Sequence, residues 1–170
     1  ADIPVKEGRL WQSLMDMGEV GALPHGGCCR AALSLEDKAG RDLLVGWMKA
    51  AGLDVRIDAI GNVIGVRAGA ENLAPVMTGS HIDTVRTGGR YDGNYGVLAG
   101  LEVVRALNEA KLTTRRPIAV AFFTNEEGAL FQPDMMGSLV YAGGVGLNDI
   151  GTRLAGERCD PDTLGWAQKI

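Results

Sequence analysis

Two clusters of ionisable residues each follow a short apolar, strand-like run. His81 and Asp83 follow the run 75–78, and the pair Glu126–Glu127 follows the run 117–124. In open α/β sheets, ligands bind at the carboxyl ends of strands. If the two runs are parallel neighbours, both clusters lie at one edge of the sheet. An imidazole among several carboxylates is a donor set that suits Zn, Mn, Co or Ni.

The two adjacent glutamates and Asp92 extend this hypothesis. Asp92 lies in the Gly-rich loop 87–96, which can fold back over the same sheet edge. Neighbouring residues of a regular strand point to opposite faces, so Glu126 and Glu127 can share a site only if the chain bends. Gly128 permits such a bend. Two adjacent carboxylates repel each other unless a cation relieves the repulsion. A metal ion with one glutamate as ligand and the other as base for a metal-activated water would do so.

The surrounding sequence predicts the elements that position these residues. Ser34 can cap a helix, and Gly52 can end it. Within the run 117–124, residues 118–123 are continuously apolar, which is typical of a strand covered on both faces. The pattern predicts an α/β fold with a mixed, largely parallel sheet flanked by helices. We expect helices over 5–17, 34–51, 97–110, 138–144 and 160–170, a hairpin of strands 54–57 and 63–67, and strands over 75–78 and 117–124.

Three segments, taken in order, resemble a known group of enzymes. They are residues 79–85, 88–100 and 124–128, and Phe131 and the run 136–138 continue the match. Together they resemble the N-carbamoyl-L-amino-acid hydrolase, allantoate amidohydrolase and β-ureidopropionase branch of the co-catalytic metallopeptidase-like amidohydrolases. The resemblance implies a zinc-peptidase-like catalytic domain that holds two divalent metal ions (Zn, Mn, Co or Ni).

The resemblance also implies a role for each candidate residue. His81 would bind one metal ion, Asp92 would bridge both ions, and Glu127 would bind one of them. Glu126 would be the general base. Asp83 would hydrogen-bond His81 and determine its tautomer. The implied reaction is hydrolysis of the carbamoyl C–N bond of an N-carbamoyl-L-amino acid or a related ureido compound, as in hydantoin utilisation, by metal-activated water.

The resemblance covers only the N-terminal part of such an enzyme. Residues 1–170 would be the first part of the catalytic domain, and the inserted dimerisation domain and the C-terminal part of the catalytic domain would lie outside them. The family needs two further histidine ligands, whereas this chain has only His25 and His81. We therefore expect the isolated chain to be inactive and the parent enzyme to be a homodimer acting on a small molecule.

Composition excludes some partners and leaves alternatives open. The net charge of −4 argues against nucleic acid or an anionic membrane as partner. No apolar run approaches the ~20 residues of a membrane span. Three cysteines, two of them adjacent, are a poor disulfide framework and favour the cytoplasm. The alternatives are a di-metal aminopeptidase or aminoacylase of the same superfamily, an inactive fragment, and a nucleotide-binding module, which the lack of a Walker lysine pattern disfavours.

Overall fold

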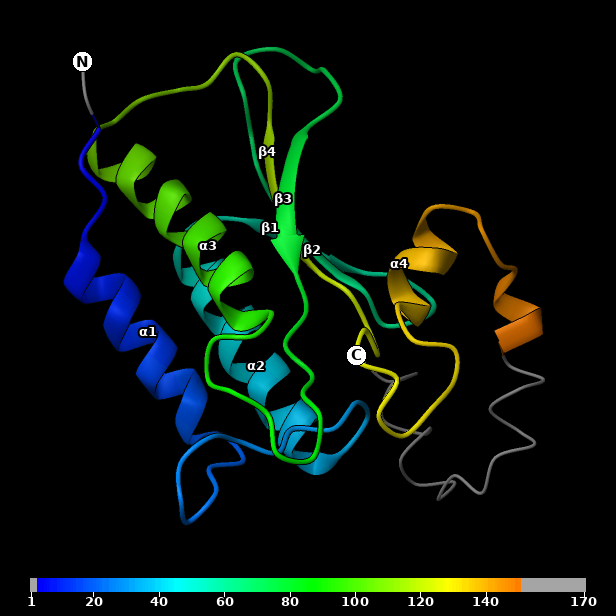
Figure 1. Ribbon diagram of the computed structural model, residues 1–170. Coiled ribbons are helices and arrows are strands. Elements are labelled where there is room, and N and C mark those ends of the chain that lie inside the picture. The colour runs from blue at the N-terminus through cyan, green and yellow to red at the C-terminus, as the bar shows by residue number, and fades with distance from the viewer. Residues whose placement is uncertain (1–2, 151–170) are drawn as a thin grey trace.

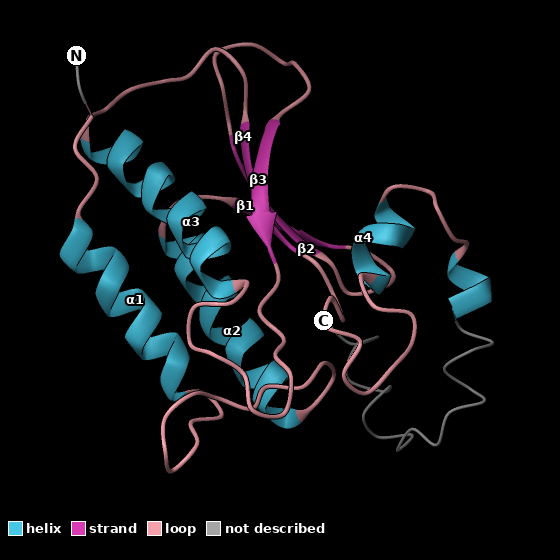
Figure 2. Cartoon of the chain, in the orientation of Figure 1, coloured by secondary structure: helices cyan, strands magenta, loops and turns pink. Residues whose placement is uncertain are grey.

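The structure is a computed structural model that describes residues 3–150 of the chain. In this range two helices are followed by three strands, and a helix, a strand and a short helix complete the order (Figures 1 and 2). The predicted α/β class with a mixed sheet and flanking helices is confirmed. The elements are α1 (Glu7–Glu19), α2 (Leu35–Ala50), β1 (Asp54–Ile57), β2 (Val63–Arg67), β3 (Val76–Ser80), α3 (Asn94–Glu109), β4 (Ile118–Phe122) and α4 (Met136–Tyr141).

Local signals account for both ends of α2. The Ser34 hydroxyl accepts a hydrogen bond from the Asp37 N–H at 3.1 Å and caps α2, as the sequence predicts. Gly52 has φ of +81° and follows the end of that helix. Helix α3 starts at Asn94, three residues before the expected 97, and α4 covers 136–141 where 138–144 was expected. The helix expected over 160–170 lies outside the described residues.

The sheet has the order β1-β2-β4-β3. Strands β3 and β4 are parallel neighbours, with Ser80 opposite Phe122, so their carboxyl ends are level. This confirms the arrangement on which the predicted site depends. The other two pairs are antiparallel, so within the described residues the sheet is mixed, but parallel pairs do not predominate. A short hairpin loop forces β1 and β2 to run in opposite directions, whereas the long crossover through α3 allows β3 and β4 to run in the same direction.

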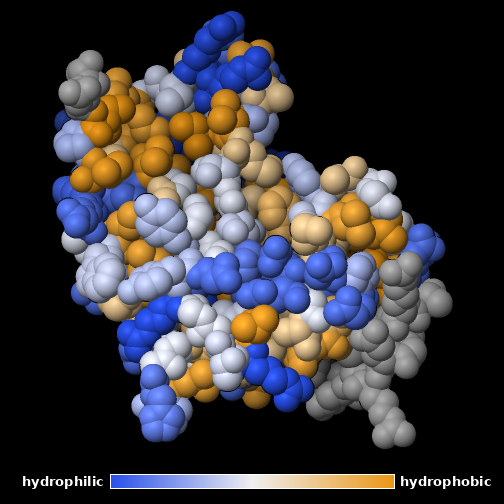
Figure 3. Space-filling view, in the orientation of Figure 1, coloured by the Kyte–Doolittle hydropathy of each residue, from blue (hydrophilic) through white to orange (hydrophobic). Residues whose placement is uncertain are grey.

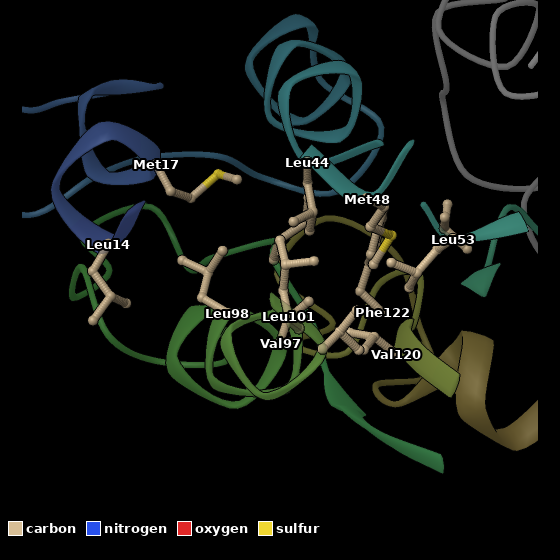
Figure 4. Close-up of a cluster of buried hydrophobic side chains, with 13 residues drawn as sticks. Leu14, Met17, Leu44, Met48, Leu53, Val97, Leu98, Leu101, Val120 and Phe122 are labelled. Atoms are coloured by element: carbon tan, nitrogen blue, oxygen red, sulfur yellow. The ribbon is translucent and has the colours of Figure 1, made fainter. Parts of the chain in front are cut away.

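Helices α1, α2 and α3 pack on one face of the sheet and form the main core with it (Figure 4). Strand β4 lies at the centre of this core, and its residues 119–122 are fully buried on both faces, as its continuous apolar sequence predicts. The packed core therefore fixes where the strand ends. Side chains that meet in this core include Leu14 and Met17 of α1, Leu44 and Met48 of α2, Val97, Leu98 and Leu101 of α3, and Val120 and Phe122 of β4.

A buried carboxylate joins α1 to α3. Glu102 is 1% exposed, and it accepts hydrogen bonds from Nε and Nη2 of Arg9, both at 2.7 Å. The backbone N–H of Lys6 donates to it at 2.9 Å. Although burial by itself would raise the pKa of Glu102, the hydrogen bonds from Arg9 and Lys6 lower this pKa below its usual range.

Replacing Glu102 by Gln is expected to lower the free energy of unfolding by about 2 kcal/mol at pH 7, because charged hydrogen bonds are lost. Since the native pKa of Glu102 is depressed, its stabilising effect is present above the unfolded pKa of about 4.3 and is lost as the pH falls through the native pKa. Urea unfolding should therefore show a deficit at pH 7 that shrinks at pH 3. An equal deficit at both pH values would contradict this account.

Glu109 provides the matched control for that experiment. Its carboxylate pairs with the same Arg9 and with Lys6, but its side chain is 42% exposed. Exposed ion pairs contribute little to stability, so Glu109→Gln is expected to unfold at the same urea concentration as the parent chain.

Two further findings concern the predictions about cellular setting. No helix of the described range is long and apolar enough to cross a membrane. Cys28 and Cys29 are both free thiols.

Candidate metal centre

The two predicted clusters come together at the level carboxyl ends of β3 and β4. His81 is the first residue after β3, and Glu126 lies four residues after the end of β4. Nε2 of His81 is 3.3 Å from Oε2 of Glu126 and 3.8 Å from Oδ1 of Asp92. In the space-filling view, hydrophilic side chains form a band just beyond the end of β3 (Figure 3). The sheet edge therefore carries one imidazole facing two carboxylates.

The imidazole of His81 is held in one tautomer by the backbone. Its side chain is only 6% exposed, and Nδ1 lies 2.9 Å from the backbone carbonyl oxygen of Asp83. A carbonyl oxygen can only accept, so Nδ1 carries the proton and donates it. The lone pair of Nε2 is then free and points toward Asp92 and Glu126, as a metal ligand requires.

The Asp83 carboxylate has different hydrogen-bond partners from the one that the sequence led us to expect. Its Oδ1 is 3.9 Å from Nδ1 of His81, beyond hydrogen-bonding distance. Instead, Oδ1 accepts from the N–H of Glu126 and Oδ2 accepts from the N–H of Glu127, both at 3.2 Å. Burial raises the pKa of Asp83 to about 6, and the charge of Asp37 adds to this effect. Asp83 thus contacts both clusters, through its carbonyl on one side and its carboxylate on the other.

Asp92 is carried by a loop pressed against His81. Gly93 has φ of +64°, and a Cβ there would lie 2.5 Å from the His81 carbonyl oxygen and 2.6 Å from its ring. Only glycine fits this approach. The Asp92 side chain itself is 70% exposed. The predicted folding of the Gly-rich loop over the sheet edge is therefore confirmed.

The bend that lets both glutamates face the site begins one residue before them. Asn125 has φ of +52° and is fully buried, and Gly128 has φ of +61°. The Nδ2 group of Asn125 donates to the carbonyls of Phe131 at 2.8 Å and Pro133 at 3.1 Å, which supports the left-handed backbone. The sequence prediction attributed the bend to Gly128 alone. An asparagine before the glutamates is the signal that could have indicated it.

Asn62 is a second supporting residue that the sequence analysis did not identify. It is fully buried, and its Oδ1 accepts from the backbone N–H of Thr124 at 3.0 Å. Its Nδ2 donates to the Gly137 carbonyl of α4 at 2.9 Å and to Asp58 at 2.8 Å. This amide therefore joins the hairpin turn, the end of β4 and α4 directly behind the glutamate pair.

Comparison with known sequences decides the family. Residues 77–163, slightly more than half of the chain, match the profile of peptidase family M20/M25/M40. The chain belongs to this family.

Individual relatives place this M20/M25/M40 chain near the carbamoylases, as the resemblance predicted. An N-carbamoyl-L-amino acid amidohydrolase of Geobacillus stearothermophilus is 48% identical over 136 residues, which are 79% of this chain and 33% of that protein. A hydantoinase/carbamoylase family amidase from Burkholderia vietnamiensis has a TM-score of 0.88 and 48% identity, over 98% of this chain and 41% of that chain. A ureidoglycolate hydrolase of Oryza sativa subsp. japonica is 39% identical over 115 residues, which are 67% of this chain and 24% of that protein.

The relatives are much longer than this chain. The chain spans about a third of the length of the curated relatives that it matches most strongly. The fold and the family are therefore established over the matched region, and the activity of a whole protein is a separate question.

The M20/M25/M40 chain concentrates negative charge where a cation would be favoured. Burial raises the pKa of Glu127, and the charges of Asp92 and Glu126 raise it further, although His81 opposes the shift. The backbone N–H of Val85 also donates to the Glu127 carboxylate. Carboxylates that raise the pKa of one another are relieved by a bound cation.

The donor chemistry fits divalent metal ions, although the side chains do not surround a position for one. In residues 3–150, no three His, Cys, Asp or Glu side chains are arranged so that they could hold a metal ion as they stand. The available donors are an imidazole Nε2 in the correct tautomer and carboxylate oxygens, which suit Zn, Mn, Co or Ni. His25, the other histidine of the chain, is exposed in the loop before α2.

Proposed function

We propose that this chain is part of a metal-dependent amidohydrolase that cleaves the carbamoyl C–N bond of N-carbamoyl-L-amino acids or related ureido compounds. The observation that carries the proposal is the approach of Asp92 and Glu126 to Nε2 of His81, at the level ends of two parallel strands. The similarity to N-carbamoyl-L-amino acid amidohydrolases and ureidoglycolate hydrolases supports the substrate class.

Each residue of the site has a proposed role. His81 and Glu127 would each hold one of two divalent metal ions, and Asp92 would contribute to holding both. A bound metal ion of this kind lowers the pKa of water and polarises a carbonyl oxygen. Asp83 holds the imidazole with its carbonyl and the glutamate turn with its carboxylate.

Glu126 is proposed to move the proton of the reaction. Its carboxylate takes a proton from the attacking water, whose oxygen bonds to the carbonyl carbon of the substrate. The C–N bond then breaks, and Glu126 passes that proton to the departing nitrogen. The Glu126 side chain is 36% exposed, so its carboxylate is open to a water molecule and a substrate.

The chain is proposed to supply only the N-terminal part of the catalytic domain. It contains two histidines, and only His81 lies at the sheet edge. We propose that further metal ligands come from sequence beyond the 170 residues, together with a dimerisation domain. On this proposal, the whole enzyme is a cytoplasmic homodimer and the isolated chain does not turn over substrate.

Substrate preference tests this function in the whole protein that carries the chain. N-carbamoyl, N-acetyl and glycyl derivatives of one L-amino acid should be compared under identical metal loading. We expect kcat/KM for the carbamoyl compound to exceed the other two by at least about 100-fold, because a site built for a ureido NH₂ leaves polar groups unpaired when that NH₂ is missing. Dialysis against a chelator should abolish turnover, and Mn²⁺, Co²⁺, Ni²⁺ or Zn²⁺ should restore it.

The same assay separates the alternatives. Preference for the glycyl derivative would identify an aminopeptidase, and preference for the acetyl derivative would identify an aminoacylase. Either result would refute the carbamoyl assignment while leaving the metal centre intact. Turnover of ureidoglycolate or allantoate above the N-carbamoyl amino acid would keep the reaction class and change the substrate.

A further inference from the structure

Arg30, in the loop between α1 and α2, is a fully buried cation without a buried counterion in contact. It is 0% exposed and forms no salt bridge within the described range. Burial lowers the pKa of Arg30, and the charges of Asp37 and Asp83 oppose this shift. Its Nε donates to the Ile82 carbonyl at 2.7 Å, and Nη1 donates to the carbonyls of Met17 and Val20 at 3.1 and 2.8 Å. Its Nη2 donates to Oδ1 of Asn94 at 3.0 Å. All of these hydrogen bonds go to neutral acceptors. A buried charge held in this way is a poor source of stability, so its geometry needs another explanation.

The partners of Arg30 lie beside two of the three proposed metal ligands, His81 and Asp92. Ile82 directly follows His81 in the chain. Asn94 follows Asp92 by two residues, and its backbone N–H donates to the Asp92 carbonyl at 2.6 Å. The Nδ2 group of Asn94 also donates to the carbonyl of Arg90 at 3.1 Å, which closes the loop around Asp92. One guanidinium group therefore ties the segment of His81 to the loop of Asp92.

A second, independent contact shows that the spacing of these segments is tight. The Gly93 backbone lies so close to His81 that a Cβ would overlap its ring and carbonyl oxygen. The Arg30 backbone also pairs with the segment after His81, since its N–H donates to Oγ1 of Thr84 at 2.8 Å and its carbonyl accepts from the Thr84 N–H at 2.9 Å. A small shift of the Asp92 loop would therefore change the distance between Asp92 and Nε2 of His81.

We propose that Arg30 is a positioning residue that sets the spacing of His81 and Asp92 through Ile82 and Asn94. The proposal rests on the proposed function, in which those two residues are metal ligands. Only a guanidinium provides a rigid, planar set of donors that reaches acceptors on three segments at once. A lysine at this position keeps the charge but cannot make these contacts together.

The test uses Co²⁺ binding by the full chain, read out by titration and by the visible absorption spectrum of the bound ion. Arg30→Lys and Asn94→Ala are each expected to weaken Co²⁺ binding by about 10- to 100-fold, as loss of ligand-supporting hydrogen bonds does, and to shift the spectrum. Both variants break the same link between Arg30 and Asn94. The double variant should therefore bind Co²⁺ no more weakly than the single variant of lower affinity.

Leu107→Ala provides the control for general destabilisation. Leu107 is buried in α3, thirteen residues or about 20 Å along the helix from Asn94. This variant should melt at a lower temperature and bind Co²⁺ as the parent does. Unchanged binding in Arg30→Lys, or an equal loss in Leu107→Ala, would overturn the proposal.

Amide hydrogen exchange distinguishes failure of this proposal from failure of the proposed function. If the parent chain binds no Co²⁺, the proposal of a metal centre is refuted. The link that Arg30 makes to the Asp92 loop is still tested by exchange at residues 90–96. Faster exchange there in Arg30→Lys than in Leu107→Ala supports the link. Equal exchange in the two variants overturns it.

Discussion

Replacing Glu126 by Gln in the whole enzyme is expected to lower kcat by about 10³-fold or more and to leave metal content unchanged. Glutamine keeps the size of the side chain and one oxygen, but it cannot take a proton from water. General-base catalysis contributes about 10²- to 10⁴-fold, so its loss alone accounts for this effect. The measurements are steady-state kinetics and elemental analysis of the dialysed variant.

Glu127→Gln is the matched partner of that experiment. Both glutamates lie in the same turn and both backbone amides are held by Asp83, so the two variants perturb the fold alike. As a proposed metal ligand, Glu127 should give the opposite signature, with loss of metal and recovery of activity at high metal concentration. If Glu126→Gln loses metal and Glu127→Gln retains it, the two roles are exchanged, because Glu126 is the residue nearer to His81.

Replacing Asp83 by Asn is expected to lower kcat by about 100-fold and metal affinity by about 10-fold. The carboxylate accepts two backbone N–H groups, one at each oxygen. An asparagine has one oxygen, so its NH₂ group must face the second N–H, and the two donors repel. The turn that carries Glu126 and Glu127 should then move.

The thermal stability of Asp83→Asn separates a positioning role from a general role in folding. Burial raises the pKa of Asp83 to about 6, so its native contribution to stability is present at low pH and is lost as the pH rises through 6. At pH 8 the metal-free variant should therefore melt only slightly below the parent, the small loss coming from the moved turn. A large loss of stability at pH 8 would show that the carboxylate holds the fold together.

The tautomer of His81 provides a further readout in the same variant. Nδ1 donates to a backbone carbonyl, which the substitution does not remove. Nitrogen chemical shifts of the imidazole should therefore report the Nδ1–H tautomer in both proteins. A change of tautomer in Asp83→Asn would show that the Asp83 carboxylate of the parent determines the tautomer, as the sequence led us to expect.

The sequence alone predicted which candidate residues would meet at the sheet edge, because each signal is local. His81 directly follows a strand, and Glu126 and Glu127 follow the one continuously apolar strand of the described fold, so strand periodicity and adjacent charges were enough. The Ser34 cap and Gly52 stop were also predicted, since both act within one helical turn. The parallel pairing of β3 and β4 followed from the helix between them.

Tertiary structure decided which groups support those residues. Arg30 meets Ile82 across 52 positions of sequence, and Asn62 meets Gly137 across 75. Nothing near either residue encodes such a partner, because a buried polar group is satisfied by whichever segment the fold brings to it. For the same reason, residue type alone did not indicate that the Asp83 carboxylate would hold the glutamate turn. The sequence determined which side chains carry the proposed chemistry, and the long-range hydrogen bonds determined how those side chains face one another.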